Sequence, residues 1–251
     1  MDKRKERGRI NITEVEPEEP HRLVISKSVM NCDEIDESIP QPLPRNSFFW
    51  IIVGKSGSGK TNLLISLLTK NNKFFNKRFD RVYMVSPSVD TIVDNPFDTL
   101  PEEQKFSELS KGNLNKILTE VEGSGENCLL VLDDCLADMK DKKLEKQLTK
   151  LSFNRRHLCG KGGRLSIIAT AQVYNRIPLQ IRKNASHLAL FKSQNKKEIE
   201  SLFSEVILIP YDSFIYLMDY VYRQKYNFLY IDTTASANNM FYKNFNRLEL
   251  N

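Results

Sequence analysis

One run of eight residues, Gly54-Lys55-Ser56-Gly57-Ser58-Gly59-Lys60-Thr61, has the residue types and spacing needed to bind a chain of phosphates. It satisfies the P-loop pattern, and an apolar run before it and a helical pattern after it supply the flanking strand and helix. The glycines let backbone N–H groups turn toward phosphate oxygens, while Lys60 neutralises charge and the Thr61 hydroxyl can hold Mg²⁺. This loop is therefore expected to bind a nucleoside triphosphate.

A second group of reactive side chains, Asp133 and Asp134, directly follows the apolar run 129–132. A carboxylate at the end of a buried strand next to a P-loop can support Mg²⁺, and an adjacent one can deprotonate the attacking water. We assign the metal to Asp133 and the role of base to Asp134. Aspartates that close a strand often only form turns, but the P-loop about seventy residues upstream favours the catalytic interpretation.

A third polar group follows the next apolar run, where Ser166-Ile167-Ile168-Ala169-Thr170 leads to Ala171-Gln172. The Gln172 amide at the end of that strand can reach the γ-phosphate or the attacking water. A surface glutamine is usually inert. The assignment therefore depends on the position of Gln172, at the end of the predicted strand that follows the Asp133-Asp134 strand in the chain.

The rest of the chain alternates short apolar runs with helical patterns, which predicts an α/β fold with a mostly parallel sheet flanked by helices. In such a sheet, ligands bind at the carboxyl edge of the strands, where the P-loop already lies. Strands are predicted at 48–53, 81–85, 128–132, 165–170, 187–191 and 228–231. Helices are predicted at 62–68, 114–122, 141–158, 196–203 and 211–222.

Three regions are predicted along the chain. Residues 1–47 alternate basic and acidic clusters with prolines, which indicates a flexible or extended N-terminal arm. That arm is either a solvated tail or a docking arm anchored by Leu23-Val24-Ile25. Residues 48–234 form the P-loop ATPase domain, and residues 235–251 form a C-terminal tail.

Composition favours a soluble intracellular protein. The 251 residues are 40% hydrophobic, enough for a sizeable core, and no apolar run reaches the ~20 residues needed to cross a bilayer. The cysteines lack CxxC spacing and are predicted to be free thiols rather than metal ligands: Cys32, Cys128, Cys135 and Cys159. A net charge of +5 is compatible with a polyanionic partner without requiring one.

Taken together, these motifs resemble the FtsK–HerA superfamily of DNA-pumping ATPases, and within it the poxvirus-type genome-packaging ATPases of large DNA viruses and virophages. The resemblance runs from Phe48 to Ile231 in the order of the family. Its residues are the P-loop, the Asp133-Asp134 strand, Arg155-Arg156-His157, the strand ending in Gln172, and 177–184 with 188–191.

The resemblance implies an ATPase that uses ATP and Mg²⁺ and threads double-stranded DNA through an oligomeric ring while packaging a viral genome. It implies an arginine from a neighbouring subunit at the γ-phosphate; among Arg155, Arg156 and Arg182 we favour Arg156. It is compatible with a capsid, portal or membrane component as partner, and with a place in the virion or the viral factory. No base-reading unit is visible, so the DNA contacts, for which Lys161 and Arg164 are candidates, are expected to be non-specific.

Two other classes of protein stay open. A nucleoside or nucleotide kinase shares the P-loop and the sheet, but the paired aspartates and Gln172 suit water activation better than transfer to a small acceptor. A non-catalytic NTP-binding scaffold of a virion is disfavoured by the intact Lys60 and Thr61.

Overall fold

The computed structural model of the chain describes residues 34–69, 74–88, 96–137, 139 and 141–250. Within these residues, nine strands form a single sheet in the order β3-β2-β4-β5-β1-β6-β7-β8-β9. The strands are β1 (Phe49–Val53), β2 (Arg81–Val85), β3 (Lys105–Phe106), β4 (Asn127–Leu132), β5 (Arg164–Ala171), β6 (His187–Phe191), β7 (Phe228–Asp232), β8 (Phe241–Lys243) and β9 (Asn246–Arg247).

Helices connect most of these strands. The α-helices are α1 (Lys60–Leu68), α2 (Lys111–Val121), α3 (Lys142–Leu158), α4 (Leu179–Arg182), α5 (Lys196–Val206) and α6 (Tyr211–Val221). Single 3₁₀ turns are η3 (Pro96–Thr99), η4 (Glu102–Gln104) and η5 (Tyr174–Arg176). In the described part of the chain no single helix is long and apolar enough to span a membrane, and only α5 and α6 together, bent by 118°, meet that length and composition.

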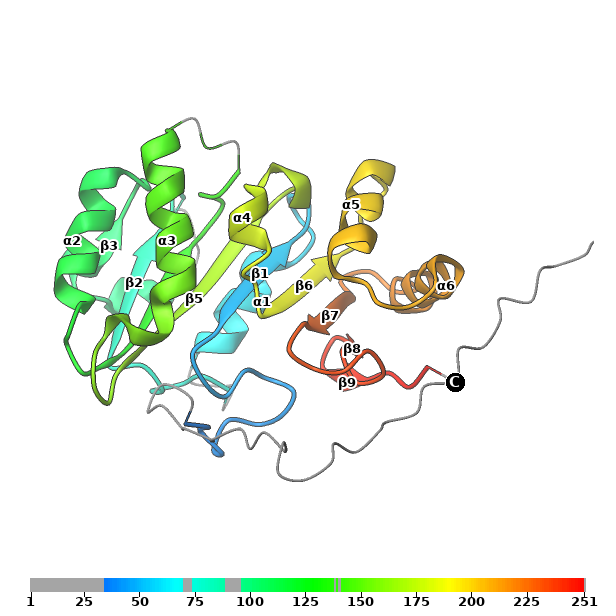
Figure 1. Ribbon diagram of the computed structural model, residues 1–251, viewed down its shortest axis with the longest axis horizontal. Coiled ribbons are helices and arrows are strands. Elements are labelled where there is room, and N and C mark those ends of the chain that lie inside the picture. Colours follow the sequence, from blue (N-terminus) through cyan, green and yellow to red (C-terminus); the bar gives the residue numbers. More distant parts are fainter. Residues whose placement is uncertain (1–33, 70–73, 89–95, 138, 140, 251) are drawn as a thin grey trace, which may run out of the picture.

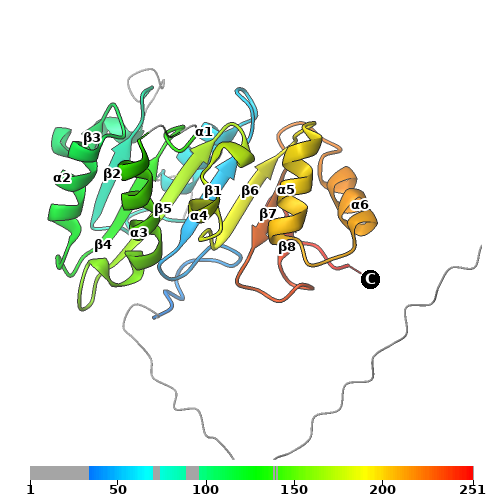
Figure 2. The same cartoon turned by 45° about the horizontal axis from the view of Figure 1, so that its top comes forward.

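The sheet is mixed, with its parallel part around the P-loop. Strands from β3 to β6 in the sheet order are parallel to their neighbours, while β7, β8 and β9 are added antiparallel. Figure 2 shows the central strands side by side, with β1 between β5 and β6. The predicted mostly parallel α/β fold is confirmed, and it aligns the carboxyl ends of β1, β4 and β5 along one edge.

The two faces of the sheet are covered differently. Every residue of β1 is buried, and its side chains alternate between two apolar cores. One core contains the apolar faces of α2 to α6, and the other contains Leu64 and Leu67 of α1. Figure 1 shows the ribbons of these helices against the sheet. Helices were predicted on both faces of the sheet. In the described residues, non-helical segments that contain Leu43 and Phe75 also cover the face on which α1 packs.

The C-terminal segment belongs to the sheet, which corrects the predicted tail at 235–251. β8 pairs antiparallel with β7, and Phe241 is completely buried. The β8–β9 hairpin turns at Asn244, whose φ of 56° asparagine tolerates well, and carries Phe245 against Trp50, with ring centroids 6.2 Å apart. Aromatic burial therefore extends the domain beyond residue 234.

The last part of the predicted N-terminal arm also packs on the domain. Ile39 and Leu43 are buried, and the Tyr230 hydroxyl donates a hydrogen bond to the Pro42 carbonyl at 2.8 Å. The domain therefore begins before the predicted residue 48, because 34–47 covers the apolar face around Trp50 and Tyr230. Residues 1–33, with the proposed anchor at 23–25, lie outside the described residues.

Candidate functional site

The loop between β1 and α1 is shaped by its glycines. Gly57 and Gly59 have φ of 73° and 106°, in the left-handed region that favours glycine. At Gly54 a β-carbon would lie 2.5 Å from Ser58 Oγ and 2.7 Å from Phe191 Cβ, so no side chain fits there. Gly59 caps α1 without a side-chain hydrogen bond, which leaves the first amides of the helix available to an anion.

Lys60 lies beneath this loop. Its side chain is buried, and Nζ donates to the carbonyls of Gly54 at 2.7 Å and Lys55 at 3.4 Å. The backbone carbonyls thus hold the ammonium group in the loop, and no carboxylate among the described residues forms an ion pair with it. Ser58 Oγ is also buried, and it has no hydrogen-bond partner in the part of the chain that the structure describes. A loop of backbone amides with a cation inside it fits the phosphates of a nucleotide.

Asp133 is held by hydroxyl groups from the strands on either side. It is 5% exposed; Ser86 Oγ donates to its Oδ2 at 2.9 Å and Thr170 Oγ1 donates to its Oδ1 at 2.6 Å. The register explains this, because Leu132 pairs with Val85 of β2 and Ala169 of β5, so the next residues meet at the carboxyl edge. The contacts of Ser86 and Thr170 with Asp133 were not predicted from the sequence. The sequence does carry one signal for them, because each of the predicted strands 81–85 and 165–170 has a hydroxyl residue at its end.

Asp134 and Gln172 meet in front of Asp133. Asp134 has a φ of 51°, its backbone N–H donates to Thr170 Oγ1 at 2.9 Å, and Gln172 Nε2 donates to its Oδ2 at 3.3 Å. Both side chains are exposed. The structure therefore brings together the predicted Asp133, Asp134 and Gln172. The Thr170 hydroxyl forms hydrogen bonds with the carboxylate of Asp133 and with the backbone N–H of Asp134.

A cleft of about 680 Å³ is lined by both the P-loop and the two aspartates. Asp133 and Asp134 belong to its lining on the β4 side of the P-loop, and Tyr226 and Phe228 belong to its lining on the β7 side. Lys60 and Thr61 lie between them. The lining also includes Ser56, Gly57, Gly59, Asn62, Leu63, Ser66, Ser88 and Phe191. With a cationic loop, a hydroxyl and two carboxylates in one cleft, the donor set fits a nucleotide with Mg²⁺.

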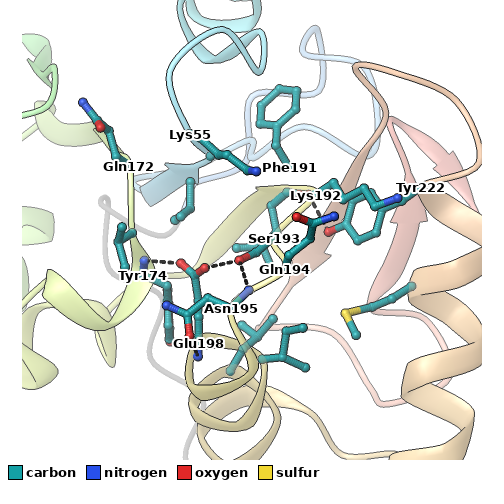
Figure 3. A pocket seen from close by; sticks show the side chains of 17 residues that line it. Lys55, Gln172, Tyr174, Phe191, Lys192, Ser193, Gln194, Asn195, Glu198 and Tyr222 are labelled. Atoms are coloured by element: carbon teal, nitrogen blue, oxygen red, sulfur yellow. Dashed lines mark hydrogen bonds between the residues drawn. The ribbon is translucent and has the colours of Figure 1, made fainter.

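A smaller cavity of about 300 Å³ lies on the other side of the P-loop (Figure 3). Lys55 and Gln172 line it, together with the buried carboxylate of Glu198 on α5. Glu198 Oε1 accepts the Tyr174 N–H at 2.5 Å, and its Oε2 accepts the Ser193 hydroxyl. Glu198 thus ties the segment after Gln172 to the β6–α5 loop.

The three predicted arginines lie away from the P-loop of their own chain. Arg155 and Arg156 are in the last turn of α3, at the amino edge of the sheet, and line a cleft with His187 and Asp232. Arg155 is buried, its Nε has no hydrogen-bond partner among the described residues, and burial lowers its pKa. Arg156 is exposed.

Arg182 is held within the domain. Its Nε donates to Glu205 Oε2 at 2.7 Å, its Nη2 donates to Glu205 Oε1 at 2.5 Å, and its guanidinium lies 5.1 Å from the Tyr174 ring centroid. The Glu205 carboxylate raises the Arg182 pKa. Of the three arginines, only Arg156 has an exposed side chain.

The two candidate DNA-contacting residues, Lys161 and Arg164, differ in their surroundings. Arg164 begins β5, and its guanidinium donates to Asn127 Oδ1 at 3.1 Å and to the Glu34 carbonyl at 2.7 Å. Gly163 packs so closely on residues 125–126 that a β-carbon there would lie 2.5 Å from Glu126 N. Arg164 is therefore a structural residue, whereas Lys161 is exposed.

The cysteines described by the structure, Cys128, Cys135 and Cys159, are free. Burial raises the Cys135 pKa to about 12, so this thiol next to the aspartates stays protonated. Cys32 lies outside the described residues.

The sequence matches a family model described as Poxvirus A32 protein over residues 40–209. The DNA packaging protein OPG160 of Variola virus is 28% identical over 170 residues, which cover 64% of this chain and 59% of that protein. The protein of the same name from Monkeypox virus is 27% identical over 177 residues, 67% of this chain and 56% of that protein. The chain thus spans less than two thirds of the length of these relatives.

Solved structures share the fold. B204, described as the DNA-packaging ATPase from Sulfolobus turreted icosahedral virus, superposes with a TM-score of 0.55 at 13% identity, covering 79% of this chain and 97% of that one. ATPases 2 and 3 of EssC from Geobacillus thermodenitrificans superpose with a TM-score of 0.54 at 16% identity, covering 92% and 48%. At these identities the likeness shows a common P-loop ATPase fold.

Proposed function

The chain belongs to the Poxvirus A32 protein family, and from that premise we propose that it is an ATPase that moves double-stranded DNA during viral genome packaging. The observation that carries the proposal is the cleft in which Lys60 and Thr61 of the P-loop face Asp133 and Asp134. Its relatives in Variola and Monkeypox viruses are named DNA packaging proteins.

In the proposed mechanism, the P-loop amides and Lys60 bind the phosphates of ATP. Thr61 and Asp133 would hold Mg²⁺, which would supply positive charge against the phosphates. The hydroxyls of Ser86 and Thr170 occupy one site on each Asp133 oxygen and fix the direction of the carboxylate.

Asp134 is the proposed base. A water molecule attacks the γ-phosphorus, the bond from that phosphorus to the β–γ bridging oxygen breaks, and Asp134 takes the proton of the water. Gln172 holds Asp134 Oδ2 and orients it. Since Asp134 is exposed at the cleft, water reaches it without passing through the protein.

Arg156 is the proposed arginine finger, acting on a neighbouring subunit of an oligomeric ring. Its exposed position at the amino edge supports action between subunits rather than within one. The proposed substrate is double-stranded DNA without sequence preference. The proposed partner is a capsid, portal or membrane component, and the proposed location is the virion or the viral factory.

Steady-state ATP hydrolysis with and without long double-stranded DNA tests the proposal. We expect DNA to stimulate hydrolysis, the stimulation to fade with salt, and Asp134→Asn to lower turnover at least about 100-fold. Phosphoryl transfer to an added nucleoside, with no hydrolysis in its absence, would point instead to the kinase. Binding of ATP without turnover would point to the scaffold.

Mixing inactive variants tests the shared site. Subunits with Arg156→Ala and subunits with Asp134→Asn should regain hydrolysis when mixed, because some interfaces then combine an intact base with an intact arginine. Absence of recovery in a mixed oligomer would exclude Arg156 as the finger.

A further inference from the structure

We infer that Tyr226 forms the wall of the cleft that binds the base of the nucleotide, by stacking its ring on the purine; this inference rests on the proposed function. Tyr226 lies in the loop between α6 and β7 and is 57% exposed, although it is a large aromatic residue. In the described part of the chain no aromatic ring packs on it. The core therefore does not account for its ring.

The position of Tyr226 matches the expected direction of the nucleotide. A β-carbon at Gly59 would lie 3.6 Å from Tyr226 Cδ1, so the ring stands directly beside the end of the P-loop. The aspartates follow β4, two strands from β1 on one side, and Tyr226 precedes β7, two strands from β1 on the other. A nucleotide whose γ-phosphate points toward Asp134 must direct its base toward the β7 side.

The backbone holds this ring in a strained conformation. Tyr226 has a φ of 69°, in the left-handed region where a bulky residue is rare and where glycine or asparagine fits better. The next residue, Asn227, is buried; its Nδ2 donates to the Val221 carbonyl at 3.0 Å, and its Oδ1 accepts from Asn244 Nδ2 at 3.2 Å. A tyrosine at a position where its backbone conformation is unfavourable points to a functional use of the ring.

Charge around the ring also suits a nucleotide. Lys225 Nζ lies 4.7 Å from the Tyr226 ring centroid, a cation–π contact that covers part of the ring. Lys225 and Arg223, together with Lys55 and Lys192, line the adjoining part of the surface with positive charge. The loop thus offers an aromatic surface for a base within a field that attracts the phosphates.

Two probes separate a base contact from a general effect on the loop: Mg²⁺ with a non-hydrolysable ATP analogue, and Mg²⁺ with inorganic tripolyphosphate, which has no base. The test variants are Tyr226→Asn, which removes the ring and keeps a residue suited to the backbone, and Tyr226→Phe, which keeps the ring. Tyr216→Ala is the matched control, since Tyr216 is 70% exposed on α6 and outside the cleft lining. Binding is measured by calorimetry and stability by thermal melting.

We expect Tyr226→Asn to weaken binding of the analogue about 5- to 100-fold, as for loss of one base–aromatic stack, with tripolyphosphate binding unchanged within about twofold. Tyr226→Phe and Tyr216→Ala should bind both probes like the native chain. Tyr226→Asn should also melt about 2–4 °C higher, because the backbone strain is relieved.

Two results would overturn the inference while leaving the proposed function standing: Tyr226→Asn binds the analogue like the native chain, or loses both probes equally. A native chain that binds neither probe would overturn the proposed function and the inference with it.

Discussion

Gln172 Nε2 donates a hydrogen bond to Asp134 Oδ2 at 3.3 Å, although the two residues lie 38 positions apart in the sequence. β5 and β4 are parallel neighbours, so their carboxyl ends deliver these side chains to the same point at the edge of the sheet. The glutamine predicted to reach the γ-phosphate or the attacking water is thus in contact with the carboxylate proposed as the base.

This contact predicts a defect in turnover rather than in binding. We expect Gln172→Leu to lower kcat for ATP hydrolysis about 10- to 100-fold with little change in KM, because Asp134 loses its orientation. Gln180→Leu, at an exposed position of α4, is the matched control and should hydrolyse ATP normally. An unchanged kcat with a raised KM would instead place Gln172 in substrate binding.

Removing a hydroxyl from Asp133 should cost stability. Thr170→Val keeps the shape of a completely buried side chain but leaves a buried carboxylate oxygen without its donor, so we expect a loss of about 1–3 kcal/mol in the free energy of unfolding. Thr119→Val on the exposed face of α2 should change it by less than about 0.5 kcal/mol. Urea denaturation measures both; equal effects would contradict the role given to Thr170.

Gly54 should tolerate no side chain. Gly54→Ala would bring a β-carbon 2.5 Å from Ser58 Oγ and 2.7 Å from Phe191 Cβ, and the loop would have to shift. We expect loss of ATP binding by calorimetry. Gly112→Ala in α2 is the control: its β-carbon meets only Ser110 Oγ at 3.9 Å, and the helix should gain about 0.5–1 kcal/mol. Normal ATP binding by Gly54→Ala would show that the loop has more room than the structure gives it.

His187 should make the fold sensitive to acid. Burial is the main cause that lowers its pKa to about 4, Asp232 opposes the shift, and Arg155 adds to it. Between about pH 6.5 and pH 4 the unfolded chain therefore binds a proton that the folded chain does not, so stability falls as the pH falls through this window. The free energy of unfolding should fall by on the order of 3 kcal/mol across this window because of His187.

Comparison with His187→Gln isolates this effect from the carboxylates that titrate nearby. Denaturation midpoints at pH 7 and pH 4.5 should differ less in His187→Gln than in the native chain. An equal difference in both would show that His187 does not titrate in this window.

The Arg182–Glu205 pair should stabilise the domain without taking part in hydrolysis. The side chains are 10% and 14% exposed, so Glu205→Gln leaves Arg182 nearly buried without its counterion, and we expect a loss of about 3–5 kcal/mol. Lys142→Ala breaks an exposed ion pair with Glu145 and should cost less than about 1 kcal/mol. If Glu205→Gln keeps its stability but loses turnover, Arg182 belongs to the catalytic machinery.

Some features of this protein could be predicted from sequence because they are encoded by neighbouring residues. The P-loop carries its glycines, Lys60 and Thr61 within eight positions, and an apolar strand precedes it. The apolar runs that became β1, β2, β4, β5, β6 and β7 were predicted for the same reason. Asp133, Asp134 and Gln172 were proposed as site residues because they follow such runs.

Other features depend on strand order and on packing between distant segments. Ser86 and Thr170 reach Asp133 only because β2 and β5 flank β4, which no local pattern encodes. The hairpin at Phe241–Arg247 joins the sheet because Phe245 packs on Trp50, almost two hundred residues earlier. The burial of Arg155, the pairing of Arg182 with Glu205, and the position of Tyr226 beside Gly59 likewise arise from tertiary contacts. Sequence alone determined which residue types follow the strands, and so which residues we propose for binding phosphate and activating water. The folded sheet decided which other side chains hold them in place, because those contacts join strands that are far apart in the sequence.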